Sequence, residues 1–394
     1  MDSVSSSVQL RTLSHIDRRR SDEETPANSI ASFATAPSPT RRKQALVLIS
    51  TFLMIFQTIG INQTYGVFQE FYTTSPASFL PEKQANNRAA VAFVGTLGAG
   101  LTWGGSIFVN PLVSRTKDVR WITGLGSVGM SLGLILAGES RNVSVIPPPE
   151  RESFSPEDIF TLPVSFVAQW RFGRPQGTRV NIALARKPTF LLQCLAALLQ
   201  ASGNFVPLTF MTTFSTTLGY TSAFAALLLA VNNGVNTISR IMLGALADYI
   251  GRQNMIVLGM LGSAASVWGL WLTAATGGGK GPWIAFVVGY GILAGGYNAL
   301  LPTVIAEIYG IQAYASVNGF IYFVRGLGAF FGSPVGGVIL DSSSSSSSLD
   351  KLGKPHEYTN VIIYDGALLL LASLCVMGVR VFDATDKGVW KLKA

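Results

Sequence analysis

Two arginines lie inside long apolar segments of this sequence, where a fixed charge is costly. Arg240 and Arg325 are each flanked on both sides by uncharged residues. Within a membrane such a residue marks a cavity, a solute pathway or an ion pair. A guanidinium also matches the two oxygens of a carboxylate, so both side chains are candidates to hold an organic anion. The alternatives are structural: Arg240 could snorkel to the cytoplasmic edge or pair with another helix, and Arg325 could form a permanent salt bridge, for example with Glu307.

Other polar residues share a helix face with Arg240. Asn233, Asn236, Gly244 and Asp248 stand three, four or eight residues apart, so they return to the same side of a helix. A polar stripe on a membrane helix should face the bundle or a water-filled cavity. Further polar residues could line that cavity, although each alone is more often an interhelical hydrogen bond: Gln193, Gln200, Asn204, Tyr290, Tyr297, Asn298 and Tyr322.

Two more residues are candidates for specific roles. Glu307 borders an apolar segment and could relay protons, although its place at a helix end favours a structural contact. Asn142 begins an Asn-Val-Ser sequence, which is a candidate glycosylation site.

The remaining reactive residue types argue against an enzyme. Cys194 and Cys375 lie in apolar segments, and His15 and His356 lie in a tail and a loop. These positions predict no disulfide framework, no metal site and no bound cofactor. No nucleotide-binding loop is present in the sequence, so we do not expect ATP to drive its activity directly.

The composition predicts a chain that crosses a membrane several times. Only 13% of the 394 residues are charged and 48% are hydrophobic, whereas soluble proteins carry about 25% charged residues. A helix needs about 20 apolar residues to span the hydrocarbon core. Charge-free runs near or beyond that length occur at residues 44–69, 89–114, 121–138, 188–239, 253–279 and 281–306. We therefore expect an all-α multi-pass membrane protein.

The basic residues behind the net charge of +8 indicate how the chain is oriented in the membrane rather than nucleic-acid binding. With a cytoplasmic N-terminus, most of the Lys and Arg residues fall in the predicted cytoplasmic segments, as the positive-inside rule expects. We expect a lipid bilayer around the protein, and no nucleic-acid partner.

The predicted segments differ in how many membrane helices they contain. Residues 1–44 form a disordered cytoplasmic tail, 45–138 three membrane helices, 188–382 six membrane helices and 383–394 a second cytoplasmic tail. Residues 139–187 are irregular, and their only apolar run is 159–170. At about 1.5 Å per residue that run reaches about 18 Å, against a hydrocarbon thickness of about 30 Å.

The clearest motif runs from Gly244 through Asp248 and Gly251 to Arg252. Glycine permits a tight turn and close helix approach, and the charged pair at the membrane edge can contact a neighbouring helix end. The motif resembles the gating loop motif of the major facilitator superfamily. Residues 62–72, 187–190, 300–310 and 322–337 resemble segments of its fungal monocarboxylate-transporter-like members.

The resemblance implies two six-helix halves with substrate held between them near the bilayer midplane. The sequence departs from the family pattern at several points; the acidic-Gly-Gly signature that often opens the first helix is absent, and residues 41–45 stand in its place. Helices five and six and most of helix four have no counterpart in the sequence, so the resemblance implies a major-facilitator-type bundle with an incomplete N-terminal half. Asn236 replaces an acidic residue that related carriers pair with the arginine at Arg240. The first membrane segment also lacks the lysine that animal members use to hold carboxylate.

These observations predict a secondary active transporter in the cell membrane. Its solute would be a small organic molecule, carboxylate or otherwise anionic, with a co-transported proton as a further expectation. The substrate-binding candidates are Arg240, Arg325, Asn236, Asn204, Tyr297 and Asn298. The alternatives are a transport-inactive truncated carrier and a membrane sensor or scaffold.

Overall fold

The computed structural model describes residues 62–70, 88–109, 186–343 and 354–388, with ten further single positions at 41, 42, 44, 45, 49, 52, 60, 124, 126 and 128. The predicted tail 1–44 and the irregular segment 139–187 lie almost entirely outside these residues. The same holds for Asn142, for residues 344–348 of the serine run and for most of the first and third predicted crossings.

The described ranges are helical and contain no strand. The main helices are α5 (Arg88–Gly104), α9 (Pro188–Thr217), α10 (Ser222–Ile250), α11 (Arg252–Ser266), α12 (Lys280–Ser343) and α13 (Thr359–Lys387). Short π-helical and 3₁₀ segments follow α11 and precede α13. The protein is thus an all-α bundle, and α13 extends five residues beyond the 382 boundary expected from the sequence.

Five stretches of the described residues are long and apolar enough to cross a membrane. They are Arg88–Val109, Pro188–Thr217, Arg252–Gly277, Lys280–Ser343 and Pro355–Lys387. Helix α10 falls outside this group because its asparagines, Arg240 and Asp248 lower its hydropathy. A helix of that composition is stable in a membrane only if its polar face is buried by other helices.

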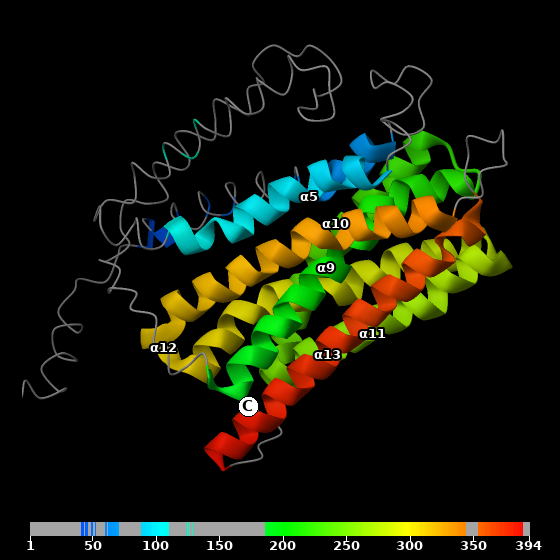
Figure 1. Ribbon diagram of the computed structural model, residues 1–394. Helices are drawn as coiled ribbons and strands as arrows, with labels where there is room; N and C mark the ends of the chain where they lie inside the picture. The colour runs from blue at the N-terminus through cyan, green and yellow to red at the C-terminus, as the bar shows by residue number, and fades with distance from the viewer. Residues whose placement is uncertain are drawn as a thin grey trace, which may run out of the picture. The chain divides into compact units, whose positions relative to one another are not determined.

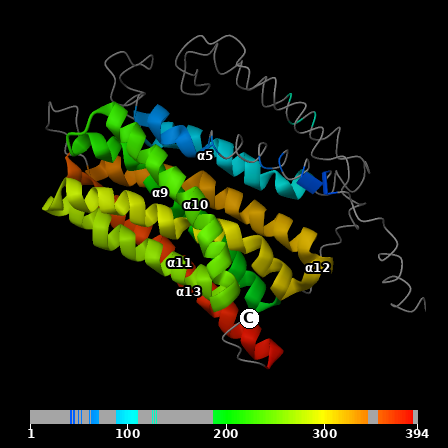
Figure 2. The same ribbon diagram turned by 180° about the vertical axis from the view of Figure 1, so that it is seen from behind.

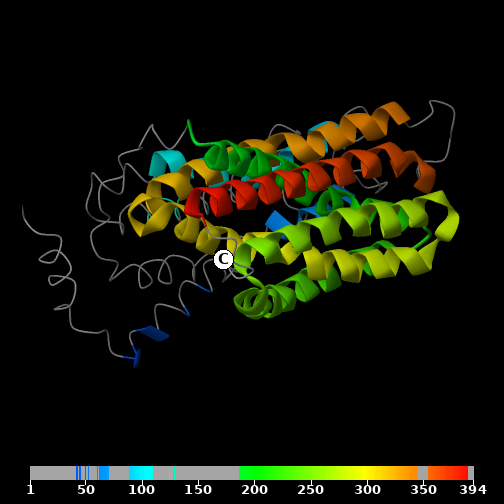
Figure 3. The ribbon, with the colours of Figure 1, turned by 90° about the horizontal axis from the view of Figure 1, so that it is seen from below.

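Two glycines divide the helical chain where it must turn. Gly251 ends α10 with a φ of 99° and starts α11, and Gly310 interrupts α12 with a φ of 77° and a ψ of 161°. Both backbone conformations are unfavourable for residues with a Cβ. The 64-residue α12 therefore forms two arms folded back on each other, which appear in yellow and orange in Figures 1 and 3.

Small residues let the second arm of α12 lie close to α5 and α9. A Cβ at Gly326 would lie 2.5 Å from the Gly104 nitrogen of α5. A Cβ at Gly332 would overlap the backbone of Ser202 on α9, and the Ser202 hydroxyl donates to the Gly328 carbonyl at 3.0 Å. This close approach places Arg325, the residue before Gly326, deep between the two helices.

Helix α9 packs against α10, α12 and α13, and α11 packs against α12 and α13 (Figures 1 and 2). Aromatic rings fill the interior where α9 ends: the Phe214 ring lies 4.5 Å from that of Trp283 and 5.1 Å from that of Tyr358. The Trp283 indole donates to the Ser215 hydroxyl at 2.9 Å. These contacts fix the end of the bundle opposite the α10–α11 turn.

Candidate functional site

Arg325 is the most buried cation of the described chain, with 1% of its surface exposed. Its Nη2 atom donates to Asn298 Oδ1 at 2.5 Å and to Gln200 Oε1 at 3.2 Å. Asn298 lies on the first arm of α12 and Gln200 on α9, so the sequence prediction that these polar residues share one interior is matched by their contacts with Arg325.

Three aromatic rings surround the Arg325 guanidinium. Its central carbon lies 4.2 Å from the centre of the Trp103 ring, and 5.3 Å from the rings of Tyr297 and Tyr322. The negative faces of aromatic rings attract a cation, and the attraction is stronger away from water. Trp103 lies on α5, so the residues around Arg325 come from α5, α9 and α12.

The described contacts of Arg325 are with neutral oxygens and rings, so none of them supplies a counter-ion. No ion pair of Arg325 occurs among the described residues, and its buried Nε atom has no hydrogen-bond partner there. The predicted alternative, a salt bridge to Glu307, is absent because Glu307 pairs with Arg252. A buried charge without an opposite charge is expensive unless an anion joins it.

Arg240 faces the same interior from α10. With Asn232, Asn233 and Asn236 it lines a small cavity that Asn204, Asn298 and Gln63 also border. The Asn236 amide donates to the Gly291 carbonyl at 3.1 Å, which holds the polar face of α10 against α12. The Nε atom of Arg240 is also buried and has no described hydrogen-bond partner. Arg325 is close enough to Arg240 for their two positive charges to repel each other.

A second small cavity adjoins the first. Asn204, Tyr290 and Ala294 border both, and the second is also lined by Gln200 and Tyr297. In each, the space open to the centre of a water-sized sphere is about 10 Å³, which is room for about one water molecule. All six substrate-binding candidates from the sequence therefore lie in or beside this pair of cavities, in a conformation too closed to hold an organic solute.

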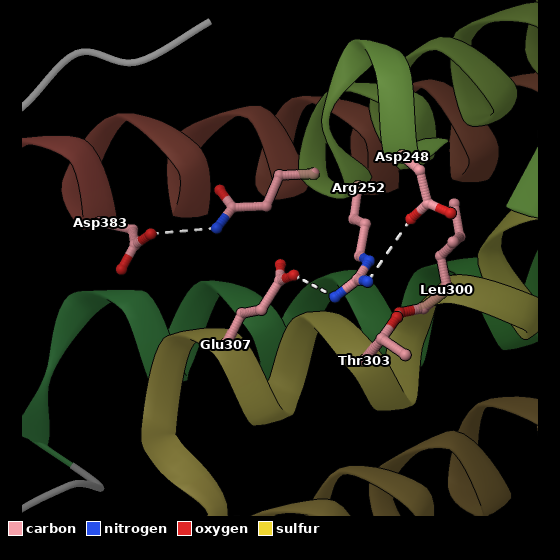
Figure 4. A network of polar contacts seen from close by, with 7 residues as sticks. Asp248, Arg252, Leu300, Thr303, Glu307 and Asp383 are labelled. Carbon is pink, nitrogen blue, oxygen red and sulfur yellow. Dashed lines mark hydrogen bonds and ion pairs between the residues drawn. The ribbon is translucent and has the colours of Figure 1, made fainter. Parts of the chain in front are cut away.

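The motif residues at the α10–α11 turn form a separate group, the turn network, shown in Figure 4. Arg252 pairs with Glu307 on α12 and lies 3.5 Å from Asp248. The next residue, Gln253, donates to Asp383 of α13 at 3.0 Å, and Lys387 donates to the same carboxylate oxygen at 2.9 Å. These contacts connect α10, α11, α12 and α13, and Glu307 makes the structural contact that its position favoured.

The two motif glycines differ in their environment. Gly251 has the positive φ that a tight turn requires. Gly244 was expected to permit close helix approach, but no described atom lies within 4 Å of the position that its Cβ would take. Close approach at Gly244 is therefore not seen in the described part of the chain.

Sequence reasoning missed two residues of this interior. Trp103 stands in a charge-free run with nothing to distinguish it from other lipid-facing or core aromatics. Asp365 is fully buried in α13, and here a signal existed: an acidic residue within an apolar membrane segment is rare and marks a functional position.

Comparison with known proteins agrees with this architecture. The family model of the Major Facilitator Superfamily matches residues 143–333 and 193–391, which together cover more than half of the chain. An MFS-type transporter of Gibberella moniliformis is 31% identical over 176 residues, 44% of this chain and 42% of its own length. The agnestins efflux protein AgnL12 of Paecilomyces divaricatus is 22% identical over 89% of this chain and 92% of its own length.

Two further matches lie outside the fungi. Monocarboxylate transporter 12-B of Danio rerio is 26% identical over 49% of this chain and 38% of its own length. The crystal structure of a bacterial homologue of the human lysosomal transporter Spinster, inward-facing and occupied, covers 89% of this chain at 13% identity, with a TM-score of 0.40.

The chain spans about half the length of several of these curated relatives, with 42% for the Gibberella protein and 56% for an MFS-type transporter of an Ophiocordyceps species. The helical bundle, the apolar segments and the family match nevertheless agree. The chain belongs to the major facilitator superfamily, a family of membrane transporters.

Proposed function

We propose that this protein is a secondary active carrier that moves a small organic anion, with a carboxylate as its recognised group, across the cell membrane. The observation that carries the proposal is the pair Arg240 and Arg325: two cations near one cavity system, each with a buried Nε and no carboxylate partner among the described residues. An anion between them would neutralise charge that the helices leave uncompensated.

The closed cavities fit one stage of alternating access. Each has room for about one water molecule, so a solute binds only after the helices separate. The turn network connects α10, α11, α12 and α13 through polar pairs at one end of the bundle. We place the opening step at this end because ion pairs at a partly exposed surface cost little to break.

The test is counterflow, the exchange of labelled for unlabelled solute, in liposomes that contain the purified full-length chain. The probes are radiolabelled pyruvate and benzoate, one aliphatic and one aromatic carboxylate. Arg240→Gln and Arg325→Gln should each lower counterflow about tenfold or more, because hydrogen bonds to charged groups are worth about 1.5–3 kcal/mol and 1.4 kcal/mol is tenfold.

The matched control is Lys280→Gln. Lys280 lies over the Tyr220 ring, 4.6 Å from its centre, at the start of α12 and away from the cavities. The control removes the same charge and should leave counterflow unchanged. If the arginine variants fail to reach the membrane while the control does, the arginines are structural and the anion-binding proposal is wrong.

The second candidate is a transport-inactive truncated carrier, or a sensor derived from one. It is favoured by the partial coverage of several curated relatives, such as 42% of the Gibberella protein and 56% of the Ophiocordyceps protein. In such a chain the polar face of α10 would lack part of its cover from the N-terminal half. The experiment grafts the complete fourth, fifth and sixth helices of a related carrier in place of residues 139–187. Counterflow that appears only in the grafted protein supports this second candidate, whereas equal counterflow excludes it.

A further inference from the structure

Asp365 is an acidic residue that the anion site does not use. It is the seventh residue of α13 and is fully buried, with no exposed surface. Neither of its carboxylate oxygens has a hydrogen-bond donor among the described residues. In contrast, Asp248, Glu307 and Asp383 each have a cationic partner.

The surroundings of Asp365 are apolar and tightly packed. A Cβ on Gly203 of α9 would lie 3.2 Å from Asp365 Oδ1 and 3.0 Å from the Leu369 side chain. The neighbouring Gly366 faces the Trp268 indole of the π-helical segment after α11 so closely that a Cβ there would overlap it. None of the described residues around this carboxylate hydrogen-bonds to it.

The ionisable groups that face Asp365 are tyrosines. Tyr290 of α12 and Tyr364 of α13 are close enough to interact electrostatically with it. No described Arg, Lys or His of α9, α11, α12 or α13 forms an ion pair with it. Within the described part of the chain, the acid therefore has no cation to stabilise its negative form.

A carboxylate in such a place is far less stable than a carboxylic acid. Burial of an unpaired ionised group costs so much that the group takes up a proton instead. Only contact with water, or with a cation, would make the ionised form stable. The protonation of this residue is thus tied to whether its surroundings are closed or hydrated.

We propose that Asp365 is a proton-binding site of the transport cycle, protonated in the closed conformation and deprotonated when the adjoining cavity fills with water. The cavity is near: Leu369, one turn along α13, and Asn204, the residue after Gly203, both line it. On opening, the O–H bond of the acid breaks, its electron pair stays on the carboxylate oxygen, and the proton passes to an entering water molecule. Closure reverses the step.

Only the coupling of proton binding to solute movement rests on the proposed carrier function. Proton binding by Asp365 is measurable without any substrate. Transport of an anion together with a proton would also offset part of the charge movement, which gives the acid a role alongside the two arginines.

The first experiment detects the proton directly. Infrared spectroscopy of the full-length protein in lipid, with ¹³C-labelled aspartate, reports protonated aspartic acids by their carbonyl stretch. The expected result at neutral pH is a protonated-aspartate band that is absent from Asp365→Asn and present in Asp386→Asn, the matched control at an exposed aspartate of the same helix. If the wild-type protein shows no such band, Asp365 is ionised and the proposal is overturned. The labelled wild-type spectrum decides this even if Asp365→Asn does not fold.

The second experiment tests coupling, in liposomes with labelled pyruvate or benzoate. Wild-type uptake should rise several-fold under an inward proton gradient, whereas Asp365→Asn should keep counterflow but lose the response to the gradient. If Asp365→Asn still responds to the proton gradient, the proposal is overturned. It is also overturned if wild-type uptake responds to a Na⁺ gradient rather than to a proton gradient and Asp365→Asn loses that Na⁺ response. Absence of all flux in wild type would refute the proposed carrier function, and the infrared result would still decide the proton site.

Discussion

At the scale of residues, the groups around the buried guanidinium of Arg325 stabilise its positive charge only in part. Arg325 has two amide oxygens as acceptors and three aromatic rings around it, which satisfy hydrogen bonds and part of the electrostatics. These groups carry no negative charge. An anion bound as proposed would supply the negative charge that these groups lack.

Arg325→Lys tests whether the shape of the cation matters as well as its charge. Lysine keeps the charge but loses the planar group that stacks on Trp103 and can bind a carboxylate through two parallel hydrogen bonds. We expect the pyruvate or benzoate concentration for half-maximal counterflow to rise about tenfold, the equivalent of 1.4 kcal/mol. Lys280→Arg is the control. An unchanged half-maximal concentration would mean that the anion does not contact Arg325.

At the scale of elements, the turn between α10 and α11 connects the helix ends. The φ of 99° at Gly251 turns the chain so that Arg252 lies against Glu307 on α12 and Gln253 against Asp383 on α13. The Arg252 and Glu307 side chains are 37% and 28% exposed, so their pair contributes about 0–1 kcal/mol to stability. A contact of that strength suits the end of the bundle at which we propose that the helices separate.

Glu307→Gln should therefore favour the open form while changing the thermal unfolding temperature little. We expect faster reaction of Cys194 with a maleimide in a Cys375→Ser background, because Cys194 is half-buried on α9 near the same end. Asp248→Asn serves as the comparison, since its contact with Arg252 is longer at 3.5 Å and its side chain is 65% exposed. Equal labelling rates in Glu307→Gln and wild type would show that the turn network does not control opening.

At the scale of the whole molecule, the helices from α9 to α13 form a bundle whose polar groups point inward, and α5 packs against the second arm of α12. Large aliphatic side chains such as Ile238, Ile241 and Met242 are exposed on the other face of α10. An exposed apolar surface of this kind matches lipid, and the basic residues then determine which ends of the helices are cytoplasmic.

The topology follows from the distribution of basic residues. Tags at positions 180 and 394 should be cytoplasmic and a tag at 345 should be exterior, because lysines and arginines cluster around 171–187 and after 380 but not in the serine run. These tag positions lie outside the described residues, and protease protection in sealed vesicles measures their side. A cytoplasmic tag at 345 would contradict the helix order after Lys187.

Much of the fold could be predicted from the sequence because membrane helices are specified locally. Hydrophobic length predicts where helices lie, since every backbone polar group in lipid must be bonded within the helix. Gly251 predicted a turn because glycine readily adopts a positive φ, and the structure has a positive φ at this residue. The polar stripe from Asn233 to Arg240 predicted an inward face, and that face does line a cavity.

Only the tertiary structure decided which residues meet. Sequence spacing could not assign Glu307 to Arg252 rather than to Arg325, because the choice depends on how far each helix end lies from the next. It could not bring Trp103 over Arg325, since that contact depends on close packing of Gly326 against Gly104. Nor could it show that both oxygens of Asp365 lack donors among the described residues. Helices are determined by near neighbours in the chain, whereas the charge balance of a buried site depends on side chains from several helices at once.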